Sequence, residues 1–357
     1  MNESIQIMTP RSLIVLSVVT AISIIAAAMS LNINRDYSVS VQGGAVFPEL
    51  LDSMDRVSKI TVTDKERETT VSRSSGGVWG VNASDGYPAS TPKVQKSILQ
   101  VAQLLYLEKK TANEKLYERL QLEGLEKDES QARRIKLFDD QNKVLADLFL
   151  GKKRLDLAGA ISAGAYVRKP NDPQTWLVSG EINFQTELKS WLRNSILNIR
   201  EEDVLKAEIR HPDGEIVRIS KEDPKTQNFT LHNIPEGKKL KYESDPNNIA
   251  NVVENLEMHD AKKAEKFEFV AKKIVTATYT SRNGLVADLA LLKLGKDDWL
   301  KVKLTVSSDH RKDDKVADIA RKITDRTRGW VFKIPGFKAE RLRRDAAKML
   351  VEKKTGS

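Results

Sequence analysis

Residues 12–34 read SLIVLSVVTAISIIAAAMSLNIN and contain no charged side chain. A helix rises about 1.5 Å per residue, so a segment of this length can cross a hydrocarbon core of roughly 30 Å. No later stretch of the 357-residue chain is comparably apolar. The sequence therefore predicts a transmembrane anchor at residues 12–34, through which the protein contacts the lipid bilayer. A water-soluble body follows it.

The same stretch shares features with a cleaved export signal, namely a charged start, an apolar middle and small residues near the end. Ala26, Ala27 and Ala28 could supply a cleavage site, but the apolar core is longer than the usual length of about 7–15 residues. We therefore favour an uncleaved anchor. Arg11 precedes the span, while Arg35 is offset by Asp36. The positive-inside tendency then places residues 1–11 in the cytoplasm and the body outside a bacterial inner membrane, in the periplasm or beyond.

The composition describes a globular body, with 40% hydrophobic and 31% charged residues. The chain has no cysteine, which excludes disulfides, thiolate catalysis and zinc sites with sulfur ligands. The net charge of +9 is concentrated near the C-terminus, where residues 311–357 contain 15 Lys or Arg against 7 Asp or Glu. Such a tail can be drawn to anionic lipid, but a solvated surface is the simpler interpretation. Aromatic residues are not interleaved with this charge, so we expect no nucleic-acid partner.

Alternating apolar and polar residues predict a series of short strands after a linker at residues 35–46. The first two, at 58–62 and 68–72, precede a hairpin turn at Ser74-Ser75-Gly76-Gly77. A helix is expected from Thr91, because Pro92 suits a first helical turn. Further strands are expected at 78–81, 134–138, 144–150 (closed by Gly151), 166–168 and 175–178, and a closing helix is expected over 184–196.

The pattern then repeats at an offset of about 140–155 residues, which is typical of a duplicated module. Val286-Ala287-Asp288-Leu289 matches Leu145-Ala146-Asp147-Leu148, and Trp330-Val331-Phe332 matches Trp176-Leu177-Val178. We predict an α+β protein, with the N-terminal transmembrane helix followed by two tandem modules of mostly antiparallel sheet and helices on one face. The modules are assigned to residues 47–199 and 200–350, followed by a tail at 351–357. Residues 338–350 are predicted to form an amphipathic basic helix.

Several motifs together resemble the DUF4340 family, a bacterial group of membrane-tethered proteins. The motifs are Phe47-Pro48 with Leu50-Leu51, Val78-Trp79, Tyr87-Pro88, the helix at 94–105, Gly151, Tyr166-Val167-Arg168 and the segment 326–335. They consist of packing and turn residues, so they identify a fold better than an activity. Proteins of this family are often encoded with ABC-2-type transporter permeases. The resemblance therefore implies an extracytoplasmic accessory subunit of such a complex.

No motif in the sequence predicts catalysis, a cofactor or a metal. The four histidines (His211, His232, His259 and His310) lack metal-ligand spacing, and no phosphate-binding loop or nucleophile elbow is present. Adjacent acids at 139–140, 297–298 and 313–314 are interpreted as turn and surface charge. Asp147 and Asp288 recur in both modules, and we expect them to form structural ion pairs with Arg168 or Lys301.

Three functions are consistent with these observations. The first is a non-catalytic accessory or scaffold protein of a membrane complex, whose anchor contains small residues suited to close helix packing. The second is a tethered binding module for a lipid, glycan or peptide. The third, a hydrolase, has the least support, because no set of reactive residues is apparent. We favour the first, and we therefore expect no enzyme activity.

Overall fold

The computed structural model describes residues 43–155, 157, 163–180, 182–270, 273–310 and 314–353. In this part of the chain, no helix is both long and apolar enough to cross a membrane. The predicted anchor at residues 12–34 and most of the predicted linker lie outside the described residues.

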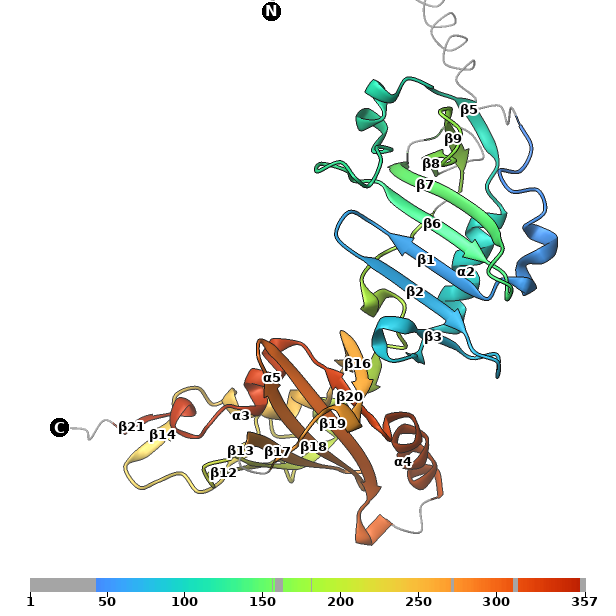
Figure 1. The fold of residues 1–357 in the computed structure, drawn as a ribbon. Helices are drawn as coiled ribbons and strands as arrows, with labels where there is room; N and C mark the ends of the chain where they lie inside the picture. Colours follow the sequence, from blue (N-terminus) through green and yellow to red (C-terminus); the bar gives the residue numbers. More distant parts are fainter. Residues whose placement is uncertain are drawn as a thin grey trace, which may run out of the picture. The chain divides into compact units, whose positions relative to one another are not determined.

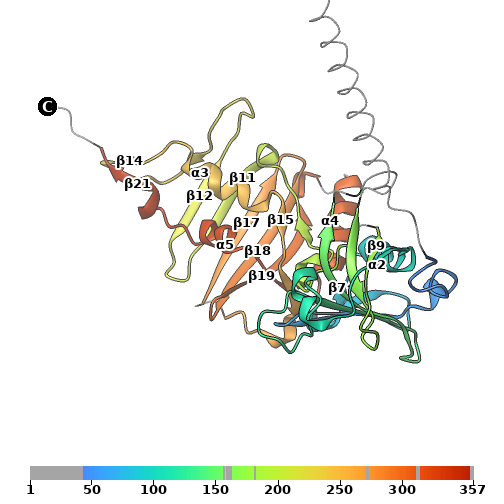
Figure 2. The same ribbon diagram turned by 90° about the horizontal axis from the view of Figure 1, so that it is seen from above.

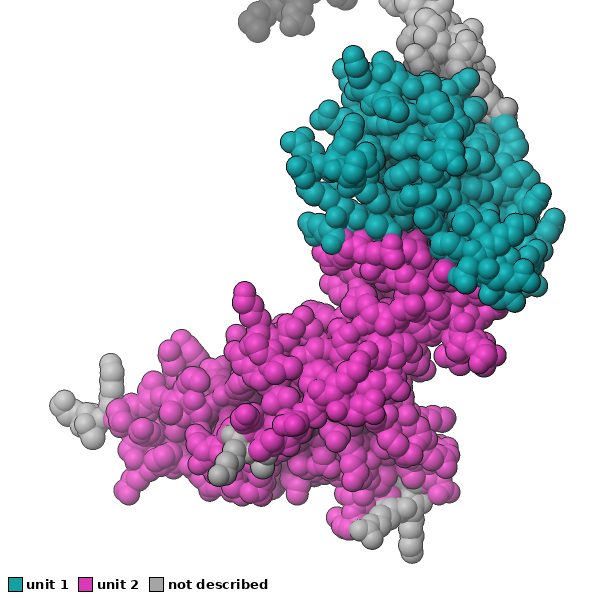
Figure 3. Space-filling view, viewed as in Figure 1, with its two compact units in different colours: residues 1–57, 63–66, 96–184 teal, residues 58–62, 67–95, 185–357 magenta. Residues whose placement is uncertain are grey.

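The chain divides into two compact units that do not follow its order (Figure 3). Unit 1 comprises residues 1–57, 63–66 and 96–184, and unit 2 comprises residues 58–62, 67–95 and 185–357. The two modules at 47–199 and 200–350 were predicted from repeated sequence patterns, whereas the two units are defined by contacts in space. The duplication of a module therefore stays a prediction.

Unit 1 contains five strands in the order β6-β7-β8-β9-β5, in which all neighbours are antiparallel (Figure 1). Their bounds are β5 (Tyr106–Lys109), β6 (Arg133–Phe138), β7 (Val144–Arg154), β8 (Gly164–Arg168) and β9 (Thr175–Ser179). In β7, Ala146 and Leu148 are buried while Leu145 and Asp147 are not, as the alternation predicts. Short 3₁₀ helices lie outside the strands: η1 (Leu51–Arg56), η3 (Glu114–Leu116) and η4 (Glu118–Leu120). Helix α2 (Thr91–Ala102) begins where it was predicted.

Strand β7 continues past Gly151 to Arg154, so the prediction that the strand ends at this glycine was wrong. A Cβ atom on Gly151 would lie 2.2 Å from the carbonyl oxygen of Leu120 and 2.9 Å from Leu122. The glycine therefore allows residues 120–122 to pack directly on the strand backbone.

The larger sheet of unit 2 has the order β13-β12-β11-β17-β18-β19-β20-β16. Its strands are β11 (Val204–Arg210), β12 (Ile216–Ser220), β13 (Thr230–Leu231), β16 (Asp260–Lys263), β17 (Ile274–Ser281), β18 (Leu285–Leu294), β19 (Asp297–Val306) and β20 (Trp330–Lys333). One face is buried and the other is partly exposed, because alternate residues of each strand point to opposite sides.

Helices α3 (Asp245–Ala250) and α5 (Gly336–Leu342) pack against this sheet (Figure 2). The hydroxyl of Tyr279, a fully buried residue of β17, donates a hydrogen bond to the carbonyl of Ile249 in α3 at 3.0 Å. A third helix, α4 (Asp314–Thr327), contacts β19 and was not predicted.

Unit 2 also contains strands from the N-terminal half of the chain, in the order β4-β3-β2-β1. They are β1 (Lys59–Thr63, whose last residue belongs to unit 1), β2 (Glu68–Arg73), β3 (Trp79–Val81) and β4 (Tyr87–Pro88). The predicted hairpin turn between β2 and β3 is confirmed: the amide of Gly77 donates to the Ser74 carbonyl at 2.9 Å. Two small pairs complete the strands, β10 (Ser195–Leu197) with β15 (Leu256–Glu257), and β14 (Lys238–Leu240) with β21 (Leu350–Glu352).

The strand orders correspond segment by segment. The order β3-β2-β1 matches β13-β12-β11, and β6-β7-β8-β9-β5 matches β17-β18-β19-β20-β16. In each set a strand from the region after the helix, β5 after α2 or β16 after α3 and β15, lies at the edge beside the last strand. The predicted fold class is confirmed at its coarser level, as an α+β chain of mostly antiparallel sheet with a few helices.

The closing helix predicted over 184–196 is wrong. The chain instead forms a 3₁₀ turn, η5 (Leu188–Ser190), and then strand β10. Its backbone is engaged elsewhere: the Trp191 carbonyl accepts from the amide of Ser90, and the indole N–H of Trp191 donates to Gln185 at 2.7 Å. Apolar residues at helical spacing are therefore buried without forming a helix.

The basic helix predicted over 338–350 is also wrong, because α5 ends at Leu342 and the chain turns through η11 (Ala347–Met349) into β21. Lys338 lies inside the protein with 5% exposure and donates to the carbonyls of Asn251 and Glu254. At least this lysine is therefore unavailable to a lipid surface. The remaining 3₁₀ helices are η2 (Asn82–Ser84), η6 (Glu201–Asp203), η7 (Asn251–Val253), η8 (Ala264–Lys266) and η10 (Ser308–His310).

Candidate functional site

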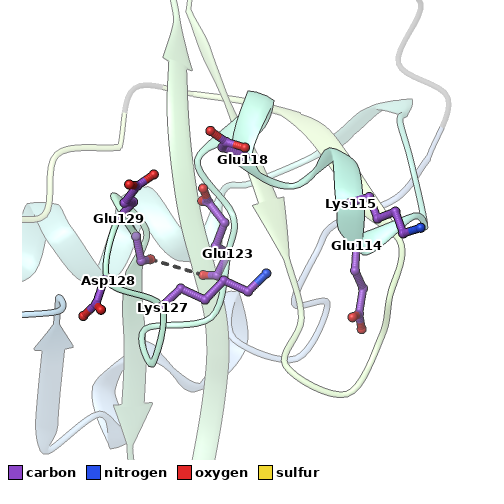
Figure 4. Close-up of a pocket in the computed structure, with 8 residues that line it drawn as sticks. Glu114, Lys115, Glu118, Glu123, Lys127, Asp128 and Glu129 are labelled. Carbon is purple, nitrogen blue, oxygen red and sulfur yellow. Dashed lines mark hydrogen bonds between the residues drawn. The ribbon is translucent and has the colours of Figure 1, made fainter.

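An acidic pocket of about 350 Å³ opens on unit 1, between η3, η4 and the irregular segment that leads into β6 (Figure 4). Five carboxylates and two ammonium groups line it, so the lining has a net negative charge. The lining residues are Glu114, Lys115, Glu118, Glu123, Lys127, Asp128, Glu129 and Ser130.

An apolar cluster contains residues that alternate in sequence with the acids of this pocket. Tyr117 and Leu122 are buried against Ala132 and Phe149, the latter from β7. The Tyr117 hydroxyl donates to the carbonyl of Pro173 at 2.5 Å, and burial raises the pKa of this hydroxyl. The segment 114–123 is thus packed against the sheet through these side chains.

Arg168 of β8 fastens the same segment to the sheet. Its guanidinium lies 4.9 Å from the ring centre of Tyr117 and 4.5 Å from that of Phe149. It also donates to the carbonyl of Leu122 at 3.4 Å, next to the pocket residue Glu123. The guanidinium therefore contacts the segment that carries Glu123, and it does not pair with Asp147 as the sequence suggested.

Glu123 differs from the other acids of the pocket because it is buried, with 6% exposure. Its Oε2 atom has no hydrogen-bond partner among the described residues. Figure 4 shows its carboxylate directed toward the side of the pocket that carries Glu118, while Glu114 and Lys115 lie on the opposite side. The pocket thus has exposed acids at its rim and an unpaired buried carboxylate in its wall.

A second site lies on the open face of the larger sheet in unit 2. Two hollows of about 570 and 320 Å³ adjoin there, and Thr278 lines both of them. The first contains a hydrogen bond of 2.7 Å between Ser220 Oγ and His232 Nε2. Charged side chains on this face are Lys206, Arg218, Lys301 and Lys303, against Glu208 and Asp288.

Within this face, Arg218 Nε donates to Glu208 at 2.6 Å, and this bond holds the pKa of the Glu208 carboxyl below its usual range. The pair joins neighbouring strands, since Glu208 and Arg218 are opposite each other in β11 and β12. Such cross-strand pairs stabilise the sheet and leave a polar, partly exposed surface.

The recurrent acids Asp147 and Asp288 do form structural contacts, but with partners that were not predicted. Asp147 binds Arg134 of β6 through two bonds of 2.9 and 2.8 Å. Asp288 accepts from the hydroxyl of Thr278 at 2.8 Å, and Lys303 rather than Lys301 is opposite it in β19. The expected pairing with Arg168 or Lys301 was wrong, because neighbouring strands offered closer partners.

Two acids interpreted as turn and surface charge are in fact buried. Asp139 is 1% exposed; its Oδ1 accepts two backbone N–H bonds and its Oδ2 binds Arg56 at 3.0 Å. Asp298 is 8% exposed and binds Arg343. Asp140, the exposed neighbour of Asp139, fits the original interpretation.

The histidines lie in separate places. Among the described residues, no group of three or more His, Cys, Asp or Glu side chains could hold a metal ion. Besides His232, His310 Nδ1 contacts the Ser307 hydroxyl at 3.2 Å. Burial, followed by the charge of Lys189, lowers the pKa of His259.

Two motifs that carry the family resemblance meet inside unit 2. Tyr87, which is fully buried, packs edge-on against Trp330 at 4.9 Å and Phe332 at 5.7 Å between ring centres. The turn before Tyr87 is held by the same region, since Asp85 binds Lys266 at 2.7 Å. These motif residues build the core of the unit, which agrees with their interpretation as packing residues.

The acidic pocket was not predicted from the sequence. Residues 114–130 read EKLYERLQLEGLEKDES. The available signal was that Tyr117 and Leu122 interrupt an acid-rich run and can anchor it. No regular spacing of the acids would have shown that one of them is buried.

Fold and sites define an α+β protein of antiparallel sheets that offers an acidic pocket and an open polar sheet face. A family model described as "Domain of unknown function (DUF4340)" matches residues 79–273, which is more than half of the chain. The chain belongs to this family. No curated protein and no solved structure matches it at a significant level.

Proposed function

We propose that this protein is a membrane-anchored, extracytoplasmic accessory or scaffold subunit without catalytic activity of its own. Its partner would be an integral membrane protein such as an ABC-2-type permease. The apolar stretch at residues 12–34 would be the anchor, and its small residues would allow close packing against partner helices.

The observation that carries the proposal is the open face of the larger sheet in unit 2. Its two adjoining hollows extend over several strands and are lined by hydroxyl and charged groups of both signs. A broad polar surface of this kind suits docking of a protein partner, in which dispersed charges set orientation and partner choice. A small-molecule site would instead be expected to be enclosed and mostly apolar.

The proposal is tested by purifying the full-length chain from native membranes in mild detergent and identifying co-purified proteins by mass spectrometry. We expect an integral membrane partner to be recovered reproducibly. The double variant Lys301→Glu/Lys303→Glu should reduce this recovery at least tenfold, because both side chains are exposed on the open face. The matched control Lys293→Glu/Lys296→Glu changes two exposed lysines near the β18–β19 turn and should leave recovery unchanged. Recovery of the bait alone would refute the proposal.

The proposed membrane topology has its own test, which uses the absence of native cysteine. Ser75→Cys places a thiol at an exposed position of the β2–β3 turn, and Ser4→Cys places one before the anchor. A membrane-impermeant maleimide should label the first variant in intact spheroplasts and the second only after lysis. The reverse result would invert the topology, and labelling of a soluble fragment that lacks the anchor would indicate cleavage.

We also propose that residues 47–199 and 200–350 descend from one duplicated module. The matching strand orders support this, as does the placement of Asp147 and Asp288 in the corresponding strands β7 and β18.

A tethered binding module remains the second candidate, and the 570 Å³ hollow favours it. Its lining contains no Phe, Tyr or Trp side chain, which makes a peptide a better fit than a stacked glycan or a lipid. Native mass spectrometry of the full-length protein, released from membranes, should then show a peptide adduct that Ser220→Ala/Thr278→Ala weakens. A spectrum of the bare protein would remove this candidate.

A further inference from the structure

The acidic pocket of unit 1 contains a carboxylate that its own unit does not satisfy. Glu123 is buried in the pocket wall, and its Oε2 has no partner among the described residues. Leaving a buried polar oxygen without a donor costs about 1–3 kcal/mol, and more where the group is charged. The four other carboxylates around it raise the local negative potential further.

The surroundings do not supply the missing donor. Lys115 points away from Glu123 in Figure 4, and no bond joins either pocket lysine to Glu123. Ser130 donates its hydroxyl to the backbone carbonyl of Glu123 at 3.4 Å, not to the carboxylate. The rim acids Glu118 and Glu129 are exposed and can turn toward a ligand. The site is therefore built for a donor that arrives from outside.

We propose that this pocket binds the arginine or lysine side chain of a basic peptide segment. A guanidinium offers five N–H donors in a planar fork, which suits several carboxylates spread around one cavity. The cavity of about 350 Å³ is large enough for a side chain and its flanking backbone. A single metal ion fits poorly, because the carboxylates of the described residues do not gather closely enough to ligate one.

The packing of the chain that carries the pocket supports this assignment. Tyr117 and Leu122 pack in an apolar cluster with Phe149 of β7, and Arg168 donates to the Leu122 carbonyl. The backbone around Glu123 is therefore held in the free protein, so binding has to order only the exposed side chains. The basic side chain has two sources with the same chemistry: another protein, or the exposed basic residues of a second copy, whose residues 311–357 contain 15 Lys or Arg against 7 Asp or Glu.

The test uses the full-length protein in lipid nanodiscs and a fluorescent peptide, acetyl-(Gly-Arg)₄-amide. Binding is followed by anisotropy at 50 and 300 mM salt, and a peptide with citrulline in place of arginine is the reference. We expect arginine-dependent binding that weakens with salt, since exposed charge pairs are screened. Glu123→Gln keeps the shape of the side chain and should weaken binding at least tenfold. The control Glu126→Gln, an exposed acid of the same segment outside the pocket lining, should change binding less than twofold.

The double variant Glu118→Gln/Glu129→Gln guards against a folding defect, because both residues are exposed. It should also weaken binding, while hydrogen exchange of unit 1 stays unchanged. Three results would each overturn the proposal. The citrulline peptide could bind as well as the arginine peptide, or Glu123→Gln and Glu126→Gln could have equal effects. Millimolar Ca²⁺ or Mg²⁺ could also displace the peptide. Sedimentation of the full-length protein in detergent distinguishes the two sources of the basic side chain. Dimers that dissociate in the Glu123→Gln variant identify a second copy of the chain, and monomers identify another protein. The site does not depend on the accessory role proposed above.

Discussion

The buried carboxylate of Asp139 should stabilise the β6–β7 hairpin far more than its neighbour Asp140 does. The Oδ1 atom of Asp139 accepts the backbone N–H groups of Gln141 and Lys143 at 3.0 and 2.9 Å, which closes the turn between the two strands. Its Oδ2 binds Arg56 at 3.0 Å, from a segment 83 residues earlier in the chain. Asp140 is exposed at the same turn.

The size of the effect follows from these contacts. Asp139→Ala removes two charge-assisted hydrogen bonds from backbone amides. Because water can partly replace the carboxylate as acceptor, each lost bond should lower the free energy of unfolding by about 1 kcal/mol. The ion pair adds at most about 1 kcal/mol, because the Arg56 side chain is 54% exposed. The total is about 2–3 kcal/mol. Asp139→Asn keeps an acceptor oxygen and should cost about 1 kcal/mol, and Asp140→Ala should stay within about 0.5 kcal/mol.

Native-state hydrogen exchange with mass spectrometry measures this locally in the full-length protein. Peptides that cover residues 133–150 should exchange about 30-fold faster in Asp139→Ala for a loss of about 2 kcal/mol, in the regime where exchange reports the opening equilibrium. Asp139→Asn should fall between this variant and the wild type, and Asp140→Ala should match the wild type. Equal acceleration in Asp139→Ala and Asp140→Ala would refute the role assigned to burial.

Three further predictions concern single side chains. Burial lowers the pKa of the Lys338 ammonium to about 8, below its unfolded value near 10.5. Between these pH values unfolding takes up a proton, so the stability of unit 2 should rise with pH by about 1–3 kcal/mol relative to Lys338→Met, as measured by hydrogen exchange corrected for intrinsic rates. Gly151→Ala should displace the segment near Leu120 and lower the stability of unit 1 by at least about 2 kcal/mol, with faster exchange of residues 114–125. Tyr279→Phe should destabilise unit 2 by about 1 kcal/mol, since the Ile249 carbonyl loses its donor.

Each of these has a matched control or a contrary outcome. Gly44→Ala should be neutral, because nothing lies within 4 Å of an added Cβ there. A stability difference between the wild type and Lys338→Met that does not change between pH 8 and 10 would contradict the burial of that ammonium. Unchanged exchange near Ile249 in Tyr279→Phe would show that the hydroxyl contributes nothing.

Local patterns were sufficient for most elements of regular structure. The alternation in residues 58–62 and 68–72 predicted strands that the structure contains, and Pro92 marked the first turn of α2. These predictions succeed because side-chain direction along a strand or helix depends on neighbours two to four residues away. Helix α4 was missed, since charged residues interrupt its apolar ones and only Val316, Ala320 and Thr327 are buried.

Features that depend on contacts between distant residues could not be predicted from local sequence patterns. Residues 184–196 have apolar residues at helical spacing, but hydrogen bonds to Ser90 and Gln185 take up the backbone and side chain of Trp191. Gly151 was read as a strand end because its contact, Leu120, lies 31 residues earlier. Of two adjacent acids, only Asp139 is buried, because Arg56 and the turn amides reach it.

The sequence by itself determined the α+β class, the repeated strand pattern and the family to which the chain belongs, since all three are written in short-range spacing and in motif order. Only the tertiary structure decided where charge is buried. Glu123 is one of many acids in a charged segment, and it becomes a site because Tyr117 and Leu122 hold that segment against β7 and turn this one carboxylate inward. The free energy of a charged group depends on the groups around it in space, and the order of residues in the sequence does not specify these neighbours.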